Sequence, residues 1–170
     1  MCGINGSLVN KKKPLLDNIT TMNNLIIHRG PDDDGVFNEA NEEYSLALGM
    51  RRLSIIDLSN GNQPMYSEDE NIVIVFNGEI YNYKVLKLKL EAKNIVFKTN
   101  SDTEVILRMY LEYGVDSFSQ LDGMFAFSIY DKRIKKLFIT RDFFGEKPLY
   151  YSNLDGDFIW GSELKSVKSQ

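Results

Sequence analysis

The feature that most constrains the fold of this chain is its series of short apolar runs, separated by charged or glycine-containing turns. Four runs follow Gly123, at Met124–Tyr130, Lys136–Thr140, Leu149–Tyr151 and Phe158–Trp160. Three more occur earlier, at Ile4–Val9, Tyr44–Met50 and Ile72–Phe76. Apolar runs of this length, bounded by turn residues, are typical of β-strands. The sequence therefore predicts a protein rich in short strands.

Apolar residues recur at helical spacing in three segments. The first is Leu15 to Ile26, and the stretch from Pro31 to Gly35 after it is predicted to form a loop. Lys84–Leu90 is a shorter candidate helix. A third helix is expected to begin at Ser101-Asp102-Thr103-Glu104, a capping-box pattern, and to end at Gly114. A few helices with many short strands indicate an α+β fold of stacked antiparallel sheets.

Composition limits the classes of protein that the chain can belong to. A length of 170 residues with 43% hydrophobic residues is typical of one globular domain. The net charge of −4 gives no reason to expect nucleic acid or a membrane as a partner. We see no secretory signal and no apolar run of membrane-spanning length. The single cysteine, Cys2, excludes an internal disulfide and fits a cytoplasmic protein.

That cysteine directly follows the initiator methionine. Its side chain is small enough for removal of Met1, which would leave a thiol and a free α-amine on one residue. An α-amine has an ordinary pKa of roughly 7.7–8.0, so it can act as a base near neutral pH. Cys2 is therefore a candidate nucleophile with its own base, although a cysteine at a frayed terminus without any role is the simpler alternative.

Three further segments carry polar residues that packing alone does not require. They are Arg52 in an otherwise apolar run, Asn77-Gly78-Glu79 after a predicted buried strand, and Asp102 at a helix N-terminus. Each has a structural alternative. Asn77-Gly78 is a common turn dipeptide, Asp102 favours the helix dipole, and Arg52 could lie on the surface. Taken singly, these residues do not distinguish a functional site from ordinary structure.

Taken together, the segments resemble the N-terminal glutaminase domain of glutamine-hydrolysing asparagine synthetases, a class II glutamine amidotransferase. The similarity covers nearly the whole chain. Its motifs are Met1-Cys2-Gly3-Ile4, His28-Arg29-Gly30-Pro31-Asp32, Arg52-Leu53-Ser54-Ile55-Ile56-Asp57, Gly61-Asn62-Gln63-Pro64-Met65, Phe76-Asn77-Gly78-Glu79-Ile80-Tyr81-Asn82, Ser101-Asp102-Thr103-Glu104, Leu121-Asp122-Gly123-Met124-Phe125-Ala126-Phe127, Arg141-Asp142-Phe143-Phe144-Gly145, Lys147-Pro148-Leu149-Tyr150-Tyr151 and Ser162-Glu163-Leu164-Lys165.

The resemblance implies a four-layer αββα fold of the N-terminal nucleophile hydrolase type. It also implies L-glutamine as the substrate and ammonia as the useful product. Cys2 would attack the side-chain amide of glutamine, with its α-amine carrying the proton. Asn77 and Gly78 would bind the oxyanion. Arg52 would bind the α-carboxylate of glutamine, and Asp102, with Glu79 assisting, its α-ammonium group.

Two features invite other interpretations. His28 is the only histidine and could form a Cys–His dyad, but the family uses the terminal amine, so a structural role is expected. The three consecutive acids Asp32–Asp34 look like metal ligands. Adjacent acids do not converge on one ion without further ligands, so we expect a solvated loop and no metal.

The chain also departs from the asparagine synthetase pattern. The pyrophosphate loop of the synthetase domain does not occur in it, and it ends before the last strands usual for the glutaminase domain. The resemblance therefore implies residues 1–170 as a glutaminase domain truncated at its C-terminal end, with a separate or missing synthetase domain or subunit to receive ammonia. No cofactor is expected for glutamine hydrolysis, and ATP and Mg would serve only the synthetase.

Two alternatives remain open from the residues. One is an amidotransferase domain that serves another acceptor, such as a sugar or a peptide. Against it, Leu53 follows Arg52 where sugar-phosphate and phosphoribosyl relatives usually have a tryptophan beside the arginine. The other is a non-catalytic module that keeps the fold. Loss of Cys2, Asn77 or Asp102 would have indicated it, and all three are present.

Overall fold

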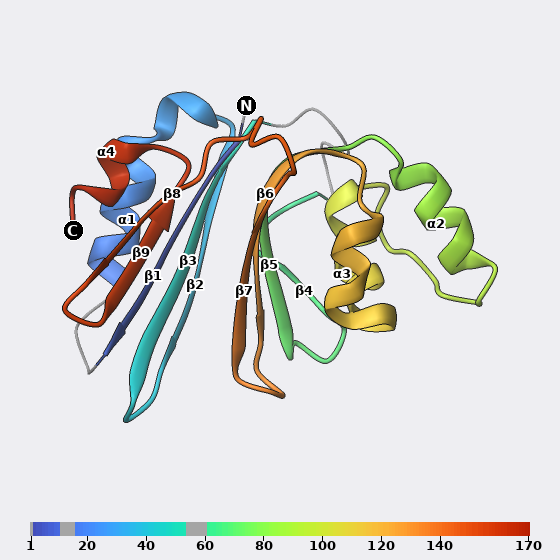
Figure 1. Ribbon diagram of the computed structural model, residues 1–170, viewed down its shortest axis with the longest axis horizontal. Coiled ribbons are helices and arrows are strands. Elements are labelled where there is room, and N and C mark those ends of the chain that lie inside the picture. Colours follow the sequence, from blue (N-terminus) through green and yellow to red (C-terminus); the bar gives the residue numbers. More distant parts are fainter. Residues whose placement is uncertain (1, 11–15, 54–60) are drawn as a thin grey trace.

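The computed structural model describes residues 2–10, 16–53 and 61–170 of the chain. Figure 1 shows two antiparallel sheets packed face to face, with α1 and α4 outside one sheet and α2 and α3 outside the other. The elements are β1 (Gly3–Asn10), α1 (Leu16–Leu25), η1 (Ile27–Arg29), β2 (Asp33–Ala40), β3 (Tyr44–Arg52), β4 (Met65–Tyr66), β5 (Ile72–Ile80), α2 (Tyr83–Glu91), α3 (Asp102–Tyr113), η2 (Gly114–Gln120), β6 (Gly123–Asp131), β7 (Lys136–Arg141), β8 (Tyr150–Leu154), β9 (Asp157–Gly161) and α4 (Leu164–Val167). The predicted α+β fold with stacked antiparallel sheets is confirmed.

The order of strands places the chain's N-terminus in the middle of a sheet. The first sheet has the order β2-β3-β1-β9-β8, and the second has the order β4-β5-β6-β7. Strand β1 is therefore paired on both sides, with Gly3 opposite Arg51 of β3 and Asn5 opposite Gly161 of β9. Pairing on both sides therefore fixes the position of the strand that directly follows Cys2.

Apolar side chains from the facing strands fill the space between the two sheets. This core includes Ile4, Leu48, Val75 and Trp160, all of which are buried. Trp160 Nε1 on β9 donates a hydrogen bond to Ser128 Oγ on β6 at 2.8 Å and so links the sheets. The indole lies directly on Gly6, where a Cβ atom would come within 1.9 Å of the ring. Only glycine fits at this position of β1.

A second core joins the β4–β7 sheet to the helices that cover it. Its members are mostly aliphatic and aromatic residues of β5, β6 and α3, with Leu86 and Leu90 from α2. A smaller cluster packs Ile19 and Met22 of α1 against Val9 and Ala47. These three apolar layers account for the amphipathic patterns that indicated the helices. No helix in the described ranges combines the length and apolar character needed to cross a bilayer.

Two loop predictions were wrong. The stretch from Asp33 to Gly35 was expected in a loop but begins β2, where Asp33 pairs with Arg52 and Gly35 with Met50 of β3. Asn77-Gly78-Glu79 was placed after a strand but lies within β5, which pairs with β6 as far as Ile80. The acidic residues of β2 are tolerated because β2 is an edge strand. Glycine is required at position 78 because a Cβ atom there would lie only 2.3 Å from a backbone oxygen of β6.

The capping prediction for α3 is confirmed for the positions of Ser101 and Glu104, but the reciprocal hydrogen bond of a capping box is not formed. Ser101 Oγ accepts a hydrogen bond from the backbone N–H of Thr103 at 3.0 Å, so Ser101 is the N-cap. The carboxylate of Glu104 does not return to Ser101. It accepts from the backbone N–H groups of Lys98 and Thr99 at 3.0 and 2.7 Å, because the preceding loop curls back over the first helical turn. The predicted end of the helix at Gly114 is confirmed.

Candidate active site

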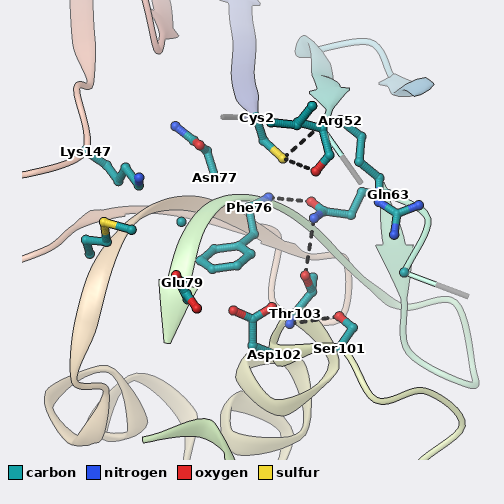
Figure 2. Close-up of a pocket in the computed structure, with 14 residues that line it drawn as sticks. Cys2, Arg52, Gln63, Phe76, Asn77, Glu79, Ser101, Asp102, Thr103 and Lys147 are labelled. Carbon is teal, nitrogen blue, oxygen red and sulfur yellow. Dashed lines mark hydrogen bonds between the residues drawn. The ribbon is translucent and has the colours of Figure 1, made fainter. Parts of the chain in front are cut away.

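A pocket lies at the edge of the two sheets, where β1, β3 and β5 meet the N-terminus of α3 (Figure 2). All six residues to which the resemblance assigned a role in glutamine hydrolysis line it: Cys2, Arg52, Asn77, Gly78, Glu79 and Asp102. They come from four chain segments that are far apart in the sequence. The other lining residues described are Leu53, Gly61, Gln63, Phe76, Ser101, Thr103, Met124 and Lys147.

Cys2 is half-buried immediately before β1. The backbone N–H of Leu53 donates to Cys2 Sγ at 3.3 Å, and the thiol lies 3.5 Å from the carbonyl oxygen of the same residue. On the other side, Arg29 Nε donates to the carbonyl oxygen of Cys2 at 3.0 Å. The nucleophile predicted from the sequence is therefore held at its backbone while its sulfur faces the pocket.

Strand β5 brings Asn77 and Gly78 to the pocket, and Figure 2 shows the side chain of Asn77 near Cys2. Asn77 is buried, and its Nδ2 lies 3.5 Å from Ser162 Oγ. That hydroxyl also accepts a hydrogen bond from the backbone N–H of Ile4 at 2.9 Å. Ser162 thus joins the strand that carries Asn77 to the strand that follows Cys2. Glu79, the next residue of β5, is exposed and lies at the rim of the pocket.

Arg52 ends strand β3 and is buried, so the interpretation as a surface arginine is wrong. Its Nη1 donates to Asn62 Oδ1 at 3.1 Å. The adjacent Arg51 points to the opposite face of the sheet, as strand geometry requires, and pairs with Asp34 Oδ1 at 3.1 Å. The two arginines therefore have separate surroundings, and only Arg52 lines the pocket.

Asp102 is the first residue of α3 and lies on the wall opposite Cys2 (Figure 2). Burial raises the pKa of Asp102 to about 6, although backbone hydrogen bonds from Ile80 and Thr103 oppose the rise. The Ile80 N–H reaches Asp102 Oδ2 at 3.1 Å. The negative charge of Glu79 raises the pKa further. A buried carboxylate with a raised pKa is suited to pair with a cation that enters the pocket.

His28 does not line the pocket. Its Nε2 lies 2.8 Å from Glu163 Oε1, and 54% of its side chain is exposed. Burial alone would raise the pKa of Glu163, but hydrogen bonds from His28, Lys165 and Arg29 outweigh it and hold that pKa below its ordinary value. His28 therefore lies, with Arg29 and Lys165, around the carboxylate of Glu163, which fits the structural role expected for it.

Metal ligation receives no support from the part of the chain that the structure describes. Its His, Cys, Asp and Glu side chains form no group of three or more that could hold an ion. Asp32 and Asp34 are exposed, as expected for solvated acids, and Asp34 is bound to Arg51. Residues 54–57, which contribute to one of the quoted motifs, lie outside the described residues, as does Leu15, the first residue of the first predicted helix.

Sequence reasoning assigned no role to three buried polar residues of the pocket, Gln63, Thr103 and Lys147. Lys147 follows a turn in which Asp142 Oδ2 accepts the Lys147 N–H at 2.9 Å, and Arg141 Nε donates to the Lys147 carbonyl at 2.6 Å. A lysine in a predicted turn normally indicates a solvated side chain. Only the motif Lys147-Pro148 could have drawn attention to it.

Comparison with known proteins links this pocket to a family. Residues 1–170 match the family model described as "Glutamine amidotransferase domain". The chain is 47% identical over 173 residues to asparagine synthetase [glutamine-hydrolyzing] 1 of Bacillus subtilis, covering 98% of this chain and 26% of that protein. It is 44% identical to the putative asparagine synthetase [glutamine-hydrolyzing] 2 of Methanocaldococcus jannaschii, covering 98% and 35%. The chain thus spans about a quarter to a third of these relatives.

Solved structures support the fold independently. The chain superimposes with a TM-score of 0.79 on glutamine phosphoribosylpyrophosphate amidotransferase from Bacillus subtilis, at 22% sequence identity, covering 98% of this chain and 43% of that one. A structure of the allosteric regulatory enzyme of purine biosynthesis matches equally well, at 21% identity with the same coverage. These similarities confirm the N-terminal nucleophile hydrolase fold expected from the sequence.

Proposed function

Because the chain belongs to the glutamine amidotransferase domain family, we propose that its pocket hydrolyses L-glutamine to glutamate and ammonia through a thioester on Cys2. One observation carries this proposal. A thiol, an amide donor, a buried guanidinium and a buried carboxylate from four separate segments line a single pocket: Cys2, Asn77, Arg52 and Asp102. Free glutamine offers one group for each of them.

The chemical step begins with loss of Met1, which exposes the α-amine of Cys2. The amine takes the thiol proton, and Sγ attacks the side-chain amide carbon of glutamine. The Leu53 N–H, 3.3 Å from Sγ, favours the thiolate. Negative charge develops on the amide oxygen, where Asn77 Nδ2 and the Gly78 N–H donate hydrogen bonds. The amine then passes its proton to the leaving nitrogen, ammonia departs, and water hydrolyses the thioester to glutamate.

Recognition uses the charges at the other end of the substrate. The planar guanidinium of Arg52 binds the α-carboxylate through two parallel hydrogen bonds. Asp102 pairs with the α-ammonium group, and Glu79 at the rim adds negative charge. Both ends of the zwitterion must be free for this clamp to close, so a glutamine side chain within a polypeptide is excluded. The reaction needs no cofactor, since side chains and backbone groups supply every proton transfer.

The ammonia is proposed to serve a synthetase domain or subunit that makes asparagine from aspartate, and ATP and Mg would belong to that partner. Support comes from the identity to asparagine synthetases and from the loop beside Lys147. This loop holds Phe143 and Phe144 at 95% and 86% exposure, with ring centroids 5.1 Å apart. Backbone N–H groups of the loop donate to Asp142, so the exposed rings sit on an ordered turn. Such a patch suits a covering partner.

The proposal places the protein in the cytoplasm, where a free thiol at the terminus stays reduced. It is tested by glutamate release from L-glutamine, run beside intact-mass analysis of the N-terminus. We expect the wild type to lack Met1 and release glutamate, and Cys2→Ala to release none above background. Equal rates in the two proteins would refute the nucleophile. Asparagine formation after addition of a synthetase polypeptide, aspartate and ATP tests the acceptor separately.

A further inference from the structure

Gln63 occupies a position that the reaction described above does not use. It is buried, it lines the pocket, and it lies in the Gly61-Asn62-Gln63-Pro64-Met65 motif, which has no assigned role. Figure 2 shows its side chain between Phe76 of β5 and Thr103 of α3. The Phe76 N–H donates to Gln63 Oε1 at 2.6 Å, and Gln63 Nε2 donates to Thr103 Oγ1 at 3.2 Å.

The reason for the first bond lies in the way strand β4 ends. β4 pairs with β5 through Met65 opposite Ile74 and Tyr66 opposite Val73. Continued two residues further, the same register places Gln63 opposite Phe76. The pairing ends at Met65, and the carbonyl oxygen of Gln63 lies against Gly35 of β2 instead of facing β5. The Gln63 side chain therefore takes the place of a backbone carbonyl and satisfies the buried Phe76 N–H.

The main chain of Gln63 is fixed from the opposite side. A Cβ atom on Gly35 would lie 2.1 Å from the carbonyl oxygen of Gln63, so the two backbones are in close contact. Gly35 belongs to β2, in the other sheet. One residue thus contacts the first sheet through its backbone and the second sheet and α3 through its side chain.

The two side-chain partners are neighbours of the residues that handle substrate. Phe76 directly precedes Asn77, and Thr103 directly follows Asp102. We propose that Gln63 is a positioning residue that sets the separation between the oxyanion donors on β5 and the ammonium-binding carboxylate on α3. Glutamine must reach both ends at once, so this separation decides whether its amide carbon meets the sulfur. The inference rests on the proposed function and adds a residue to it.

Loss of the two hydrogen bonds that Gln63 forms with Phe76 and Thr103 should lower the rate of glutamine turnover more than the reactivity of the Cys2 thiol. Gln63→Leu keeps the size of the side chain and leaves the Phe76 N–H and the Thr103 hydroxyl without their partner. A displacement of about 1 Å in a reacting geometry can cost on the order of 100-fold in rate. Cys2 is held by Leu53 and Arg29 instead, so alkylation of its thiol should not depend on Gln63.

The test measures kcat/KM for L-glutamine in the wild type, Gln63→Leu, Thr103→Val and the double variant. Each single change is expected to lower kcat/KM about tenfold or more. The kcat/KM of the double variant should lie within about twofold of that of the less active single variant, because both changes remove the same hydrogen bond between Gln63 and Thr103. The rate of Cys2 alkylation by iodoacetamide should stay within about twofold of the wild type in all four proteins. Gln120→Leu, the same replacement at the end of η2, is the matched control and should keep full activity.

Separate outcomes refute the two proposals. A wild type that releases no glutamate contradicts the proposed function. An active wild type with a Gln63→Leu variant within about twofold of it overturns the role of Gln63, as does a double variant whose losses multiply. If Gln63→Leu does not fold, a comparison of Thr103→Ser with Thr103→Val tests the role of Gln63 instead. Thr103→Ser keeps the hydroxyl and should retain most activity, whereas equal losses in Thr103→Ser and Thr103→Val would refute the bridge.

Discussion

The backbone N–H of Leu53 points at Cys2 Sγ from 3.3 Å. Leu53 directly follows Arg52, so one short segment at the end of β3 contacts the sulfur and supplies the guanidinium of the pocket. A backbone donor keeps its hydrogen bond when the thiol loses its proton, and the bond strengthens when the sulfur becomes negative. The proposed nucleophile and the arginine proposed to bind the α-carboxylate are therefore positioned by the same segment of chain.

Asn77 offers the most direct test of the oxyanion site. Asn77→Ala removes a side-chain donor, and the loss of one such donor typically costs about 2.7–4 kcal/mol of transition-state stabilisation, or roughly 100- to 1,000-fold in kcat. We expect kcat for glutamine hydrolysis to fall by this factor, with KM changed far less. Steady-state glutamate release measures both constants. A kcat within threefold of wild type would remove Asn77 from the mechanism.

Arg52 should act on binding. Arg52→Ala removes two charged hydrogen bonds to the α-carboxylate, so KM for glutamine is expected to rise on the order of 100-fold. Arg51→Ala is the matched control, because that arginine is also buried but contacts Asp34 on the other face of the sheet. An unchanged KM in Arg52→Ala, or equal effects at both positions, would count against the carboxylate clamp.

Several parts of this site could be predicted from sequence because they depend on local signals. The strands of the core were recognised from apolar runs, and Ser101 from its position before a helix. Asn77-Gly78 was misplaced because the dipeptide has a strong turn preference. Pairing with Ala126 and Phe125 in β6 overrides that preference, and such long-range pairing leaves no local trace. The start of β2 at Asp33 was missed for the same reason.

The convergence of the pocket could not be derived from spacing. Cys2, Arg52 and Asp102 meet only because β1 lies beside β3 and α3 packs over β5, and the resemblance to a family supplied that information. The role of Gln63 was missed because a glutamine before a proline has no distinctive pattern. Its hydrogen bonds to Phe76 and Thr103 appear only when three elements are assembled.

The raised pKa of Asp102 leads us to expect that glutamine binding depends on pH. Burial raises its pKa to about 6, so below that pH the group is protonated and must lose its proton before it can pair with the α-ammonium. The dissociation constant should therefore rise as the pH falls through about 6, approaching tenfold per pH unit. Calorimetric titration of Cys2→Ala with L-glutamine between pH 5 and pH 8 avoids turnover and measures this directly.

The matched control for that titration is Asp102→Asn. This variant keeps an oxygen for the Ile80 N–H but cannot carry charge, so it should bind glutamine weakly and with little change across the same pH range. If Asp102→Asn retained the inflection near pH 6, another group would be responsible.

His28 is expected to be dispensable for chemistry. Its ring is bound to Glu163 and half-exposed, and it does not line the pocket. His28→Gln should therefore lower kcat by less than about threefold, whereas loss of a general base typically costs about 100-fold or more. Glutamate release at saturating glutamine distinguishes the two cases. A loss of the larger size would instead support a Cys–His pair.

The most direct measurement concerns the amine that Met1 blocks. The protein is expressed behind an N-terminal extension, and a site-specific protease then removes the extension together with Met1, so that the chain begins at Cys2. Glutamate release is recorded before and after cleavage, with intact mass confirming each terminus. We predict background rates before cleavage and turnover after it. Full activity with the extension still attached would contradict the claim that the terminal amine is the base.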